Sequence, residues 1–266
     1  MPELPEVETI RRRLAEELPG RSVRSCGAHA SEKFRPAATV RGARFAAVRR
    51  RGKYLLVELH DGRDLVVHLG MTGSLGFLPT GDTVPADPYV RAWWELDDGR
   101  TLRFRDVRRF GRLAVVERGA YDGLPTLAAL GPEPFDEELT AAGFHAALRG
   151  TRARLKTAVL GQRVIAGVGN IYADEAFWRA GVNPAVRRLG RPGAERLLDA
   201  LRAVLQEGIE HGGTTLRDYR DADGGSGTNQ HRLDCYGRGG LPCRRCGGTL
   251  RRRVLDGRST VSCPTC

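Results

Sequence analysis

Four cysteines in the last 24 residues constrain the fold of this 266-residue chain more than any other feature. They form two pairs, Cys243-x2-Cys246 and Cys263-x2-Cys266, which enclose the sixteen residues 247–262. Two residues between paired cysteines let both sulfurs of a turn reach one tetrahedral ion, and two such turns leave no open position. The spacing therefore predicts a structural zinc site. The alternatives are two disulfides or a redox pair, and neither explains two matched turns.

The segment between the cysteine pairs predicts a β-hairpin. Residues 250–255 and 259–262 can pair as strands across Asp256-Gly257, a favoured two-residue turn, which places Arg258 beside the tip. Residues 231–266 carry eight arginines and two aspartates, or +6 of the chain's net charge of +11. A rigid basic finger can grip phosphate; a solvated basic face is the alternative interpretation.

Composition places the chain among soluble globular proteins. The hydrophobic content of 41% is enough for one or two packed domains. No apolar run is long enough to span a membrane, and the acidic start does not resemble a signal peptide, so we expect a cytosolic protein. Cys26 and Cys235 stand alone and are expected to be buried. The chain has only three lysines, Lys33, Lys53 and Lys156.

Hydrophobic periodicity divides the chain into a β-rich and a helical part. Residues 3–18 have apolar side chains at helical spacing, and Pro19-Gly20 ends the predicted helix. Short β-type runs follow, which predict a β-sandwich or barrel packed with one helix. The expected strands are 43–48, 54–59, 65–69, 92–96, 102–104 and 113–116, and the expected later helices are 136–148, 152–160, 171–180 and 193–211. A glycine-rich loop over 212–227 leads to the cysteine-bearing tail.

The N-terminus admits a structural and a chemical interpretation. Pro2 and Glu3 suit the first turn of a helix. Removal of Met1 would leave Pro2 with a free secondary amine, and an α-amino group titrates near pH ~8. Such an amine can attack a sugar or carbonyl carbon to form a Schiff base, while Glu3 and Glu6 exchange protons with it. The residues alone leave both interpretations open.

Five separated motifs and the cysteine-rich tail together resemble bacterial formamidopyrimidine-DNA glycosylases of the Fpg/Nei family. The motifs are Pro2–Glu8, Arg51–Leu56, His68–Gly73, Arg108–Gly111 and Gly167–Glu175. The resemblance implies a bifunctional glycosylase and abasic-site lyase that removes oxidised purines, chiefly 8-oxoguanine and formamidopyrimidines, from duplex DNA. It implies that Pro2 attacks C1′ of the damaged nucleotide and that β,δ-elimination then cuts the strand.

The resemblance also implies roles for individual residues. Glu3 would protonate the deoxyribose ring oxygen, with Glu6 in support, and Lys53 and Arg258 would hold phosphates beside the lesion. Met71, Arg108 and Phe110 would fill the gap left by the extruded nucleotide. Further DNA contacts are expected from Lys156 on a helix facing the DNA, from Asn170 at a helix start, and from Thr214, Arg217 and Tyr219 in the lesion-recognition loop.

The expected architecture is α+β in four parts. These are a catalytic β-sandwich domain with an N-terminal helix (1–122), a linker (123–134), a helix-two-turn-helix domain with the lesion loop (135–228) and a zinc finger (229–266). We expect one zinc ion per chain and a monomer in the bacterial cytosol and nucleoid. Asn229 and Cys235 depart from the usual family residues, which bears on loop ordering. The alternatives are an endonuclease VIII-like enzyme for oxidised pyrimidines and a non-catalytic damage-binding zinc protein.

Overall fold

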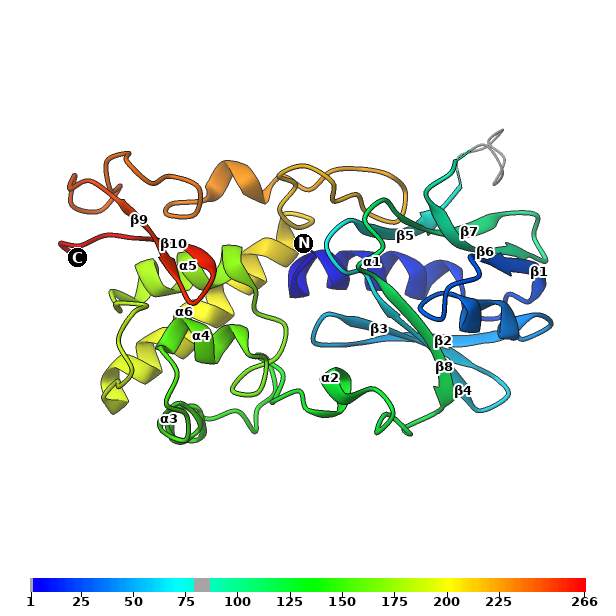
Figure 1. The fold of residues 1–266 in the computed structure, drawn as a ribbon, viewed down its shortest axis with the longest axis horizontal. Helices are drawn as coiled ribbons and strands as arrows, with labels where there is room; N and C mark the ends of the chain where they lie inside the picture. Colours follow the sequence, from blue (N-terminus) through cyan, green and yellow to red (C-terminus); the bar gives the residue numbers. More distant parts are fainter. Residues whose placement is uncertain (1, 79–86) are drawn as a thin grey trace. The chain divides into compact units, whose positions relative to one another are not determined.

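The computed structural model describes residues 2–78 and 87–266 and divides into two units (Figure 1). Unit 1 holds the chain up to Ala128 together with His211–Gln230, and unit 2 holds Ala129–Glu210 and His231–Cys266. The glycine-rich loop therefore returns to unit 1, whereas the sequence pattern groups it with the helices. Among the described residues, no helix is long and apolar enough to cross a membrane.

Unit 1 contains two four-stranded antiparallel sheets and one long helix (Figure 1). The first sheet has the order β1-β6-β7-β5, with β1 (Val23–Ala28), β6 (Val90–Leu96), β7 (Thr101–Asp106) and β5 (Gly73–Phe77). The second has the order β2-β3-β4-β8, with β2 (Phe45–Arg51), β3 (Tyr54–Leu59), β4 (Arg63–His68) and β8 (Arg112–Glu117). The other elements are α1 (Leu4–Glu17), the 3-10 helix η1 (Arg35–Val40) and α2 (Pro125–Ala128).

Both sheets and α1 share one core. Fully buried side chains come from α1 (Ile10), from one sheet (Trp94, Phe104) and from the other (Phe45, Leu65). The predicted N-terminal sheets packed with a helix are thus confirmed. Because α1 buries one apolar face in this core, the residues at its start are held on a rigid element.

Strands β1 and β5 were not predicted, because both are rich in small residues. Gly73 and Gly76 lie in β5, and glycine is unfavourable in strands unless another backbone approaches closely. A Cβ atom on Gly76 would lie 2.3 Å from the carbonyl oxygen of Ala222. The backbone of the 211–230 segment therefore requires a glycine at this position of the strand.

Unit 2 consists of helices followed by the finger. The helices are α3 (Ala141–Arg149), α4 (Leu155–Leu160), α5 (Asn170–Ala180) and α6 (Arg191–Glu210). A 3-10 turn, η3 (Asn229–Arg232), begins in unit 1 and ends in unit 2, before the finger. The finger hairpin has β9 (Arg251–Leu255) and β10 (Arg258–Ser262), as predicted. Asp256 and Gly257 both have positive φ, as the tight turn between the strands requires.

Candidate functional site

Two buried carboxylates fix the start of α1. Glu3 and Glu6 are 2% and 1% exposed. The backbone N–H of Glu3 donates to Oε2 of Glu6 at 2.7 Å, and the Glu3 side chain accepts from the backbone of Glu6, which completes a capping box. Pro2 is buried directly before this box. The N-terminal proline therefore emerges from an immobilised helix end.

Glu6 also anchors the segment 211–230. Its Oε1 accepts the backbone N–H of Thr214 at 2.7 Å, and Asn229 donates to Oγ1 of Thr214 at 2.9 Å. The hydroxyl of Tyr219 donates to the carbonyl of Glu6 at 3.4 Å. Thr214 and Tyr219 are thus interior anchors of the loop, whereas Arg217 between them is exposed.

Two neighbouring loops of unit 1 present apolar side chains to solvent. Met71 is 40% exposed and Phe110 is 49% exposed, and the guanidinium carbon of Arg108 lies 4.8 Å from the centroid of the Phe110 ring. Large apolar side chains in such positions contribute little to the core. These three residues form what we call the wedge cluster.

Asp106, at the end of β7, ties the two loops together. It is fully buried, and its carboxylate accepts from the Thr72 hydroxyl at 2.6 Å and from the Gly111 backbone at 2.7 Å. The Thr72 hydroxyl in turn accepts the backbone N–H of Arg108 at 3.1 Å. One carboxylate thereby sets the position of both loops that carry the wedge cluster.

Lys53 lies at the turn between β2 and β3 and is 8% exposed. His68, at the end of β4, packs against Tyr54 with ring centroids 4.7 Å apart and ring planes tilted by 45°. Its Nδ1 accepts the backbone N–H of Gly70 at 3.2 Å. Burial, together with the charge of Lys53, lowers the pKa of His68 to about 4. The imidazole beside Lys53 is therefore neutral at physiological pH.

Lys156 in unit 2 does not lie on the surface; it is 1% exposed and joins the helices to the finger. Its ammonium donates to Asp174 Oδ1 at 2.6 Å, to the Ser259 carbonyl at 2.9 Å and to the Thr260 hydroxyl at 2.9 Å. Asp174 also accepts the backbone N–H of Val261 at 2.9 Å. Burial raises the pKa of Asp174 to about 6, against the pull of Lys156. Lys156 thus forms an internal ion pair, which we call the finger clamp, and its expected contact with DNA stays a prediction.

Asn170 and Arg258 lie at the two sides of this clamp. Asn170 begins α5 after a turn held by Gln162, and its side-chain amide donates to the Ser259 carbonyl at 3.0 Å. Arg258, next to Ser259, is exposed and has no side-chain ion pair with any residue that the structure describes. The hairpin therefore presents the Arg258 guanidinium to solvent beside its tip, in addition to the exposed arginines of β9.

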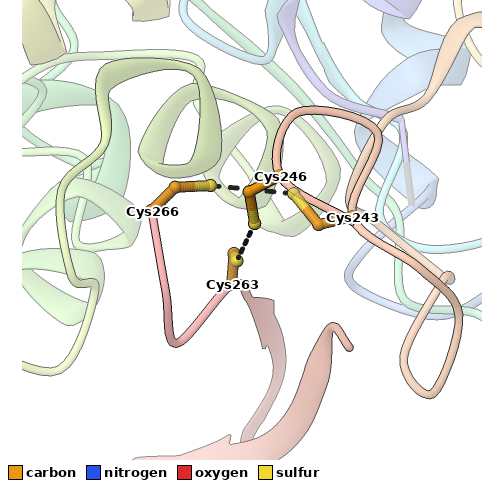
Figure 2. Close-up of side chains that lie close together, drawn as sticks. All are labelled: Cys243, Cys246, Cys263 and Cys266. Carbon is orange, nitrogen blue, oxygen red and sulfur yellow. Dashed lines mark hydrogen bonds between the residues drawn. The ribbon is translucent and has the colours of Figure 1, made fainter. Parts of the chain in front are cut away.

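The four predicted metal ligands converge in the finger (Figure 2). Cys243 and Cys266 have sulfurs 3.7 Å apart, Cys246 and Cys263 have sulfurs 3.5 Å apart, and all four sulfurs lie within 4.8 Å of one another. A zinc tetrahedron with bonds of ~2.3 Å requires sulfurs about 3.8 Å apart. The thiols are free, which excludes the disulfide alternative. The residues fit one structural zinc ion.

Three carboxylates in these contacts were given no role by the sequence analysis. Asp106 and Asp174 are described above, and Glu175 accepts the backbone N–H groups of Asp234, Cys235 and Tyr236 at 2.9, 2.8 and 2.6 Å. Acidic residues on an otherwise apolar helix were the available signal for Asp174 and Glu175. The isolated Cys235 is buried as expected, whereas Cys26 is only half-buried.

Three family profiles match the chain. They describe the formamidopyrimidine-DNA glycosylase N-terminal domain (residues 1–113), the formamidopyrimidine-DNA glycosylase H2TH domain (130–220) and a zinc finger found in FPG and IleRS (240–266). Formamidopyrimidine-DNA glycosylase from Thermus thermophilus is 48% identical, covering 100% of this chain and 98% of the relative. The formamidopyrimidine-DNA glycosylase from Herpetosiphon aurantiacus is 45% identical, covering 100% of this chain and 99% of the relative.

Solved structures agree with these matches. The crystal structure of the Thermus thermophilus MutM (Fpg) protein has a TM-score of 0.92 at 48% identity and covers 100% of this chain and 98% of its own. The complex between Lactococcus lactis Fpg and abasic-site DNA has a TM-score of 0.90 at 31% identity, with 99% and 98% coverage. A complex of the same Lactococcus protein with Fapy-dG DNA has a TM-score of 0.89 at 30% identity, with 99% coverage of both chains.

Proposed function

Because this chain belongs to the formamidopyrimidine-DNA glycosylase family, we propose that Pro2 and Glu3 carry out its chemistry at the start of α1. The chain is a DNA glycosylase of oxidised-purine repair, and abasic-site lyase activity is part of the family's function. The buried carboxylates of Glu3 and Glu6, directly after Pro2, support the assignment of the reaction to this helix end.

The nucleophile is the secondary amine of Pro2 after removal of Met1. Its nitrogen forms a bond to C1′ of the damaged nucleotide, the glycosidic bond breaks, and the base leaves with the proton that the Pro2 nitrogen gives up. Glu3 supplies a proton to the sugar ring oxygen, the bond between that oxygen and C1′ breaks, and the resulting iminium between C1′ and the Pro2 nitrogen permits β,δ-elimination. Glu6 is a positioning residue, since both of its carboxylate oxygens accept backbone N–H groups.

The wedge cluster replaces the extruded nucleotide. Phe110 is wide enough to stack between base pairs, Met71 fills the remaining volume, and Arg108 donates to the orphaned base. Extrusion costs a few kcal/mol of stacking, which these contacts partly offset. Their exposure and the link through Asp106 support this role.

Phosphates are held by Lys53, Asn170 and Arg258, while Lys156 acts through the finger clamp. The exposed Arg217 is the DNA-facing residue of the lesion loop, and Thr214 and Tyr219 anchor it on Glu6. The substrate is duplex DNA containing 8-oxoguanine, formamidopyrimidine or an abasic site; the Lactococcus relative's complexes contain DNA with an abasic site or Fapy-dG. The enzyme acts as a monomer on the DNA of the bacterial cytosol and nucleoid.

Base excision and covalent trapping test this proposal together. With an 8-oxoguanine:cytosine duplex and borohydride, the native protein should form a covalent adduct, and Glu3→Gln should lower base excision at least about 100-fold. A parallel duplex with thymine glycol distinguishes an endonuclease VIII-like preference. Faster release of thymine glycol, or full excision activity in Glu3→Gln, would contradict the proposal.

A further inference from the structure

Cys243 is the buried ligand of the zinc finger. It is 2% exposed, whereas Cys246 and Cys266 are exposed and Cys263 is half-buried. Four thiolates around one zinc ion carry a net double negative charge, and each sulfur is stabilised by hydrogen-bond donors. Water can supply donors to the exposed sulfurs. The sulfur of Cys243 must obtain its donors from the protein.

Trp178 on α5 supplies such a donor. Its indole Nε1–H donates to Sγ of Cys243 at 3.2 Å, and its ring packs against the small apolar cluster that contains Cys243 and Leu250. The Arg245 guanidinium lies 4.5 Å from the centroid of the Trp178 ring and donates to the Arg179 carbonyl at 3.0 Å. The indole is therefore fixed on both sides, with its N–H directed at the sulfur.

We propose that Trp178 is a positioning residue of the zinc site, whose N–H orients the Cys243 thiolate and offsets its charge. The indole then lengthens the residence time of zinc in the finger. It also forms a further connection between α5 and the finger, separate from the Lys156–Asp174 pair that contacts the hairpin. Because Arg179 pairs with Glu207 through two hydrogen bonds, α6 supports the same end of α5.

Zinc release from the full-length protein tests the proposal without relying on activity. Trp178→Phe keeps an aromatic ring under Arg245 but lacks the N–H. Its zinc should transfer to an excess of the chromophoric chelator pyridylazoresorcinol about tenfold faster than zinc from the native protein, as for other second-sphere donors. Trp93→Phe is the matched control, since Trp93 lies in unit 1, and it should release zinc at the native rate. Equal rates for Trp178→Phe and the native protein would overturn the proposal.

A measurement on the native sequence covers the case in which Trp178→Phe fails to fold. The protein is labelled with ¹⁵N-tryptophan and loaded with ¹¹³Cd in place of zinc. A hydrogen bond to a metal-bound sulfur should give a resolved coupling between the Trp178 indole proton and ¹¹³Cd, whereas Trp93 and Trp94 should show none. Absence of that coupling, with an indole resonance that does not shift between the zinc and cadmium forms, would overturn the proposal.

Discussion

Phe110 is half exposed at the surface of unit 1, with Arg108 over its ring. Because little of its surface is buried, Phe110→Ala should change the free energy of unfolding by less than about 1 kcal/mol. Excision of 8-oxoguanine from duplex DNA should nevertheless fall at least about tenfold, equivalent to about 1.4 kcal/mol of barrier. Single-turnover kinetics and urea unfolding measure the two effects separately.

Tyr89→Ala is the matched control for Phe110→Ala. Tyr89 is 40% exposed in the same unit and also lies under an arginine, Arg105, at 5.0 Å. It lies outside the wedge cluster, so excision should be unchanged. Equal losses of excision in both variants would assign the effect to exposed aromatic surface in general and would contradict the wedge role.

His68 predicts a pH dependence of stability. Its pKa in the folded protein is about 4, against 6.5 in the unfolded chain, so the unfolded state binds more protons between these values. The contribution of His68 to the free energy of unfolding is therefore complete above pH 6.5. It is lost as the pH falls toward 4, by up to about 3 kcal/mol. Urea titrations at pH 7, 5.5 and 4 should show this loss in the native protein relative to His68→Gln. Parallel curves for the two proteins would refute the assignment.

Residue type and spacing were sufficient to predict the zinc ligands, but not which other side chains are buried. Met71 and Phe110 are residue types that usually lie in a core, yet the tertiary structure leaves them exposed. Lysine usually lies on the surface, yet Lys156 is paired inside unit 2 with an aspartate eighteen positions away in the sequence. Such pairings depend on helix packing and finger docking, which no local pattern encodes.

At the scale of elements, the finger clamp joins α4, α5 and β10. Lys156→Met leaves the buried Asp174 without its cation, which should cost about 3–5 kcal/mol of unit 2 stability, measurable by thermal unfolding. The double variant Lys156→Met/Asp174→Leu removes the uncompensated charge and should recover much of this loss. If Lys156→Met had native stability, the ion pair would not be the element that holds the hairpin.

Measurements of DNA binding distinguish the role of the finger clamp from that of the exposed Arg258 on the same hairpin. Arg258→Gln should lower the slope of log affinity against log salt by about 0.9, because one phosphate contact is lost. The double variant at Lys156 and Asp174 should keep the native slope, since the ammonium is buried. A reduced slope in the double variant would restore Lys156 as a direct phosphate contact. Fluorescence anisotropy with a duplex that contains an abasic-site analogue gives both slopes.

Hydrophobic periodicity predicted α1, α5 and α6 closely, and the Asp256-Gly257 turn predicted the finger hairpin. The predicted helix over 136–148 begins at Ala141 in the structure, where Thr140 caps it by accepting the Gly143 backbone N–H at 3.1 Å. The weakly apolar strands β1 and β5 were missed because their glycines are required by close contacts, with the Trp93 side chain at Gly27 and with backbone at Gly73 and Gly76. Local pattern therefore predicts elements that bury an apolar face, and it misses those defined by close contacts with other segments.

At the scale of the whole molecule, zinc and charge act together in the tail, which carries +6 of the net charge of +11. Cys263→Ser should abolish zinc binding and DNA binding, because the finger loses its fixed geometry, while the helices of unit 2 keep their circular dichroism. Elemental analysis should give one zinc per native chain and none in the variant. Native DNA affinity in zinc-free protein would contradict a structural role for the metal.

The boundaries expected at residues 122, 134 and 228 stay predictions.

The chemistry of the whole enzyme depends on the amine of Pro2 as the nucleophile. Borohydride reduction of the enzyme bound to 8-oxoguanine DNA, followed by proteolysis and tandem mass spectrometry, locates the covalent link. We expect the reduced sugar on the nitrogen of Pro2 in the N-terminal peptide, with Met1 removed. A link to Lys53, or to any other side-chain amine, would contradict it.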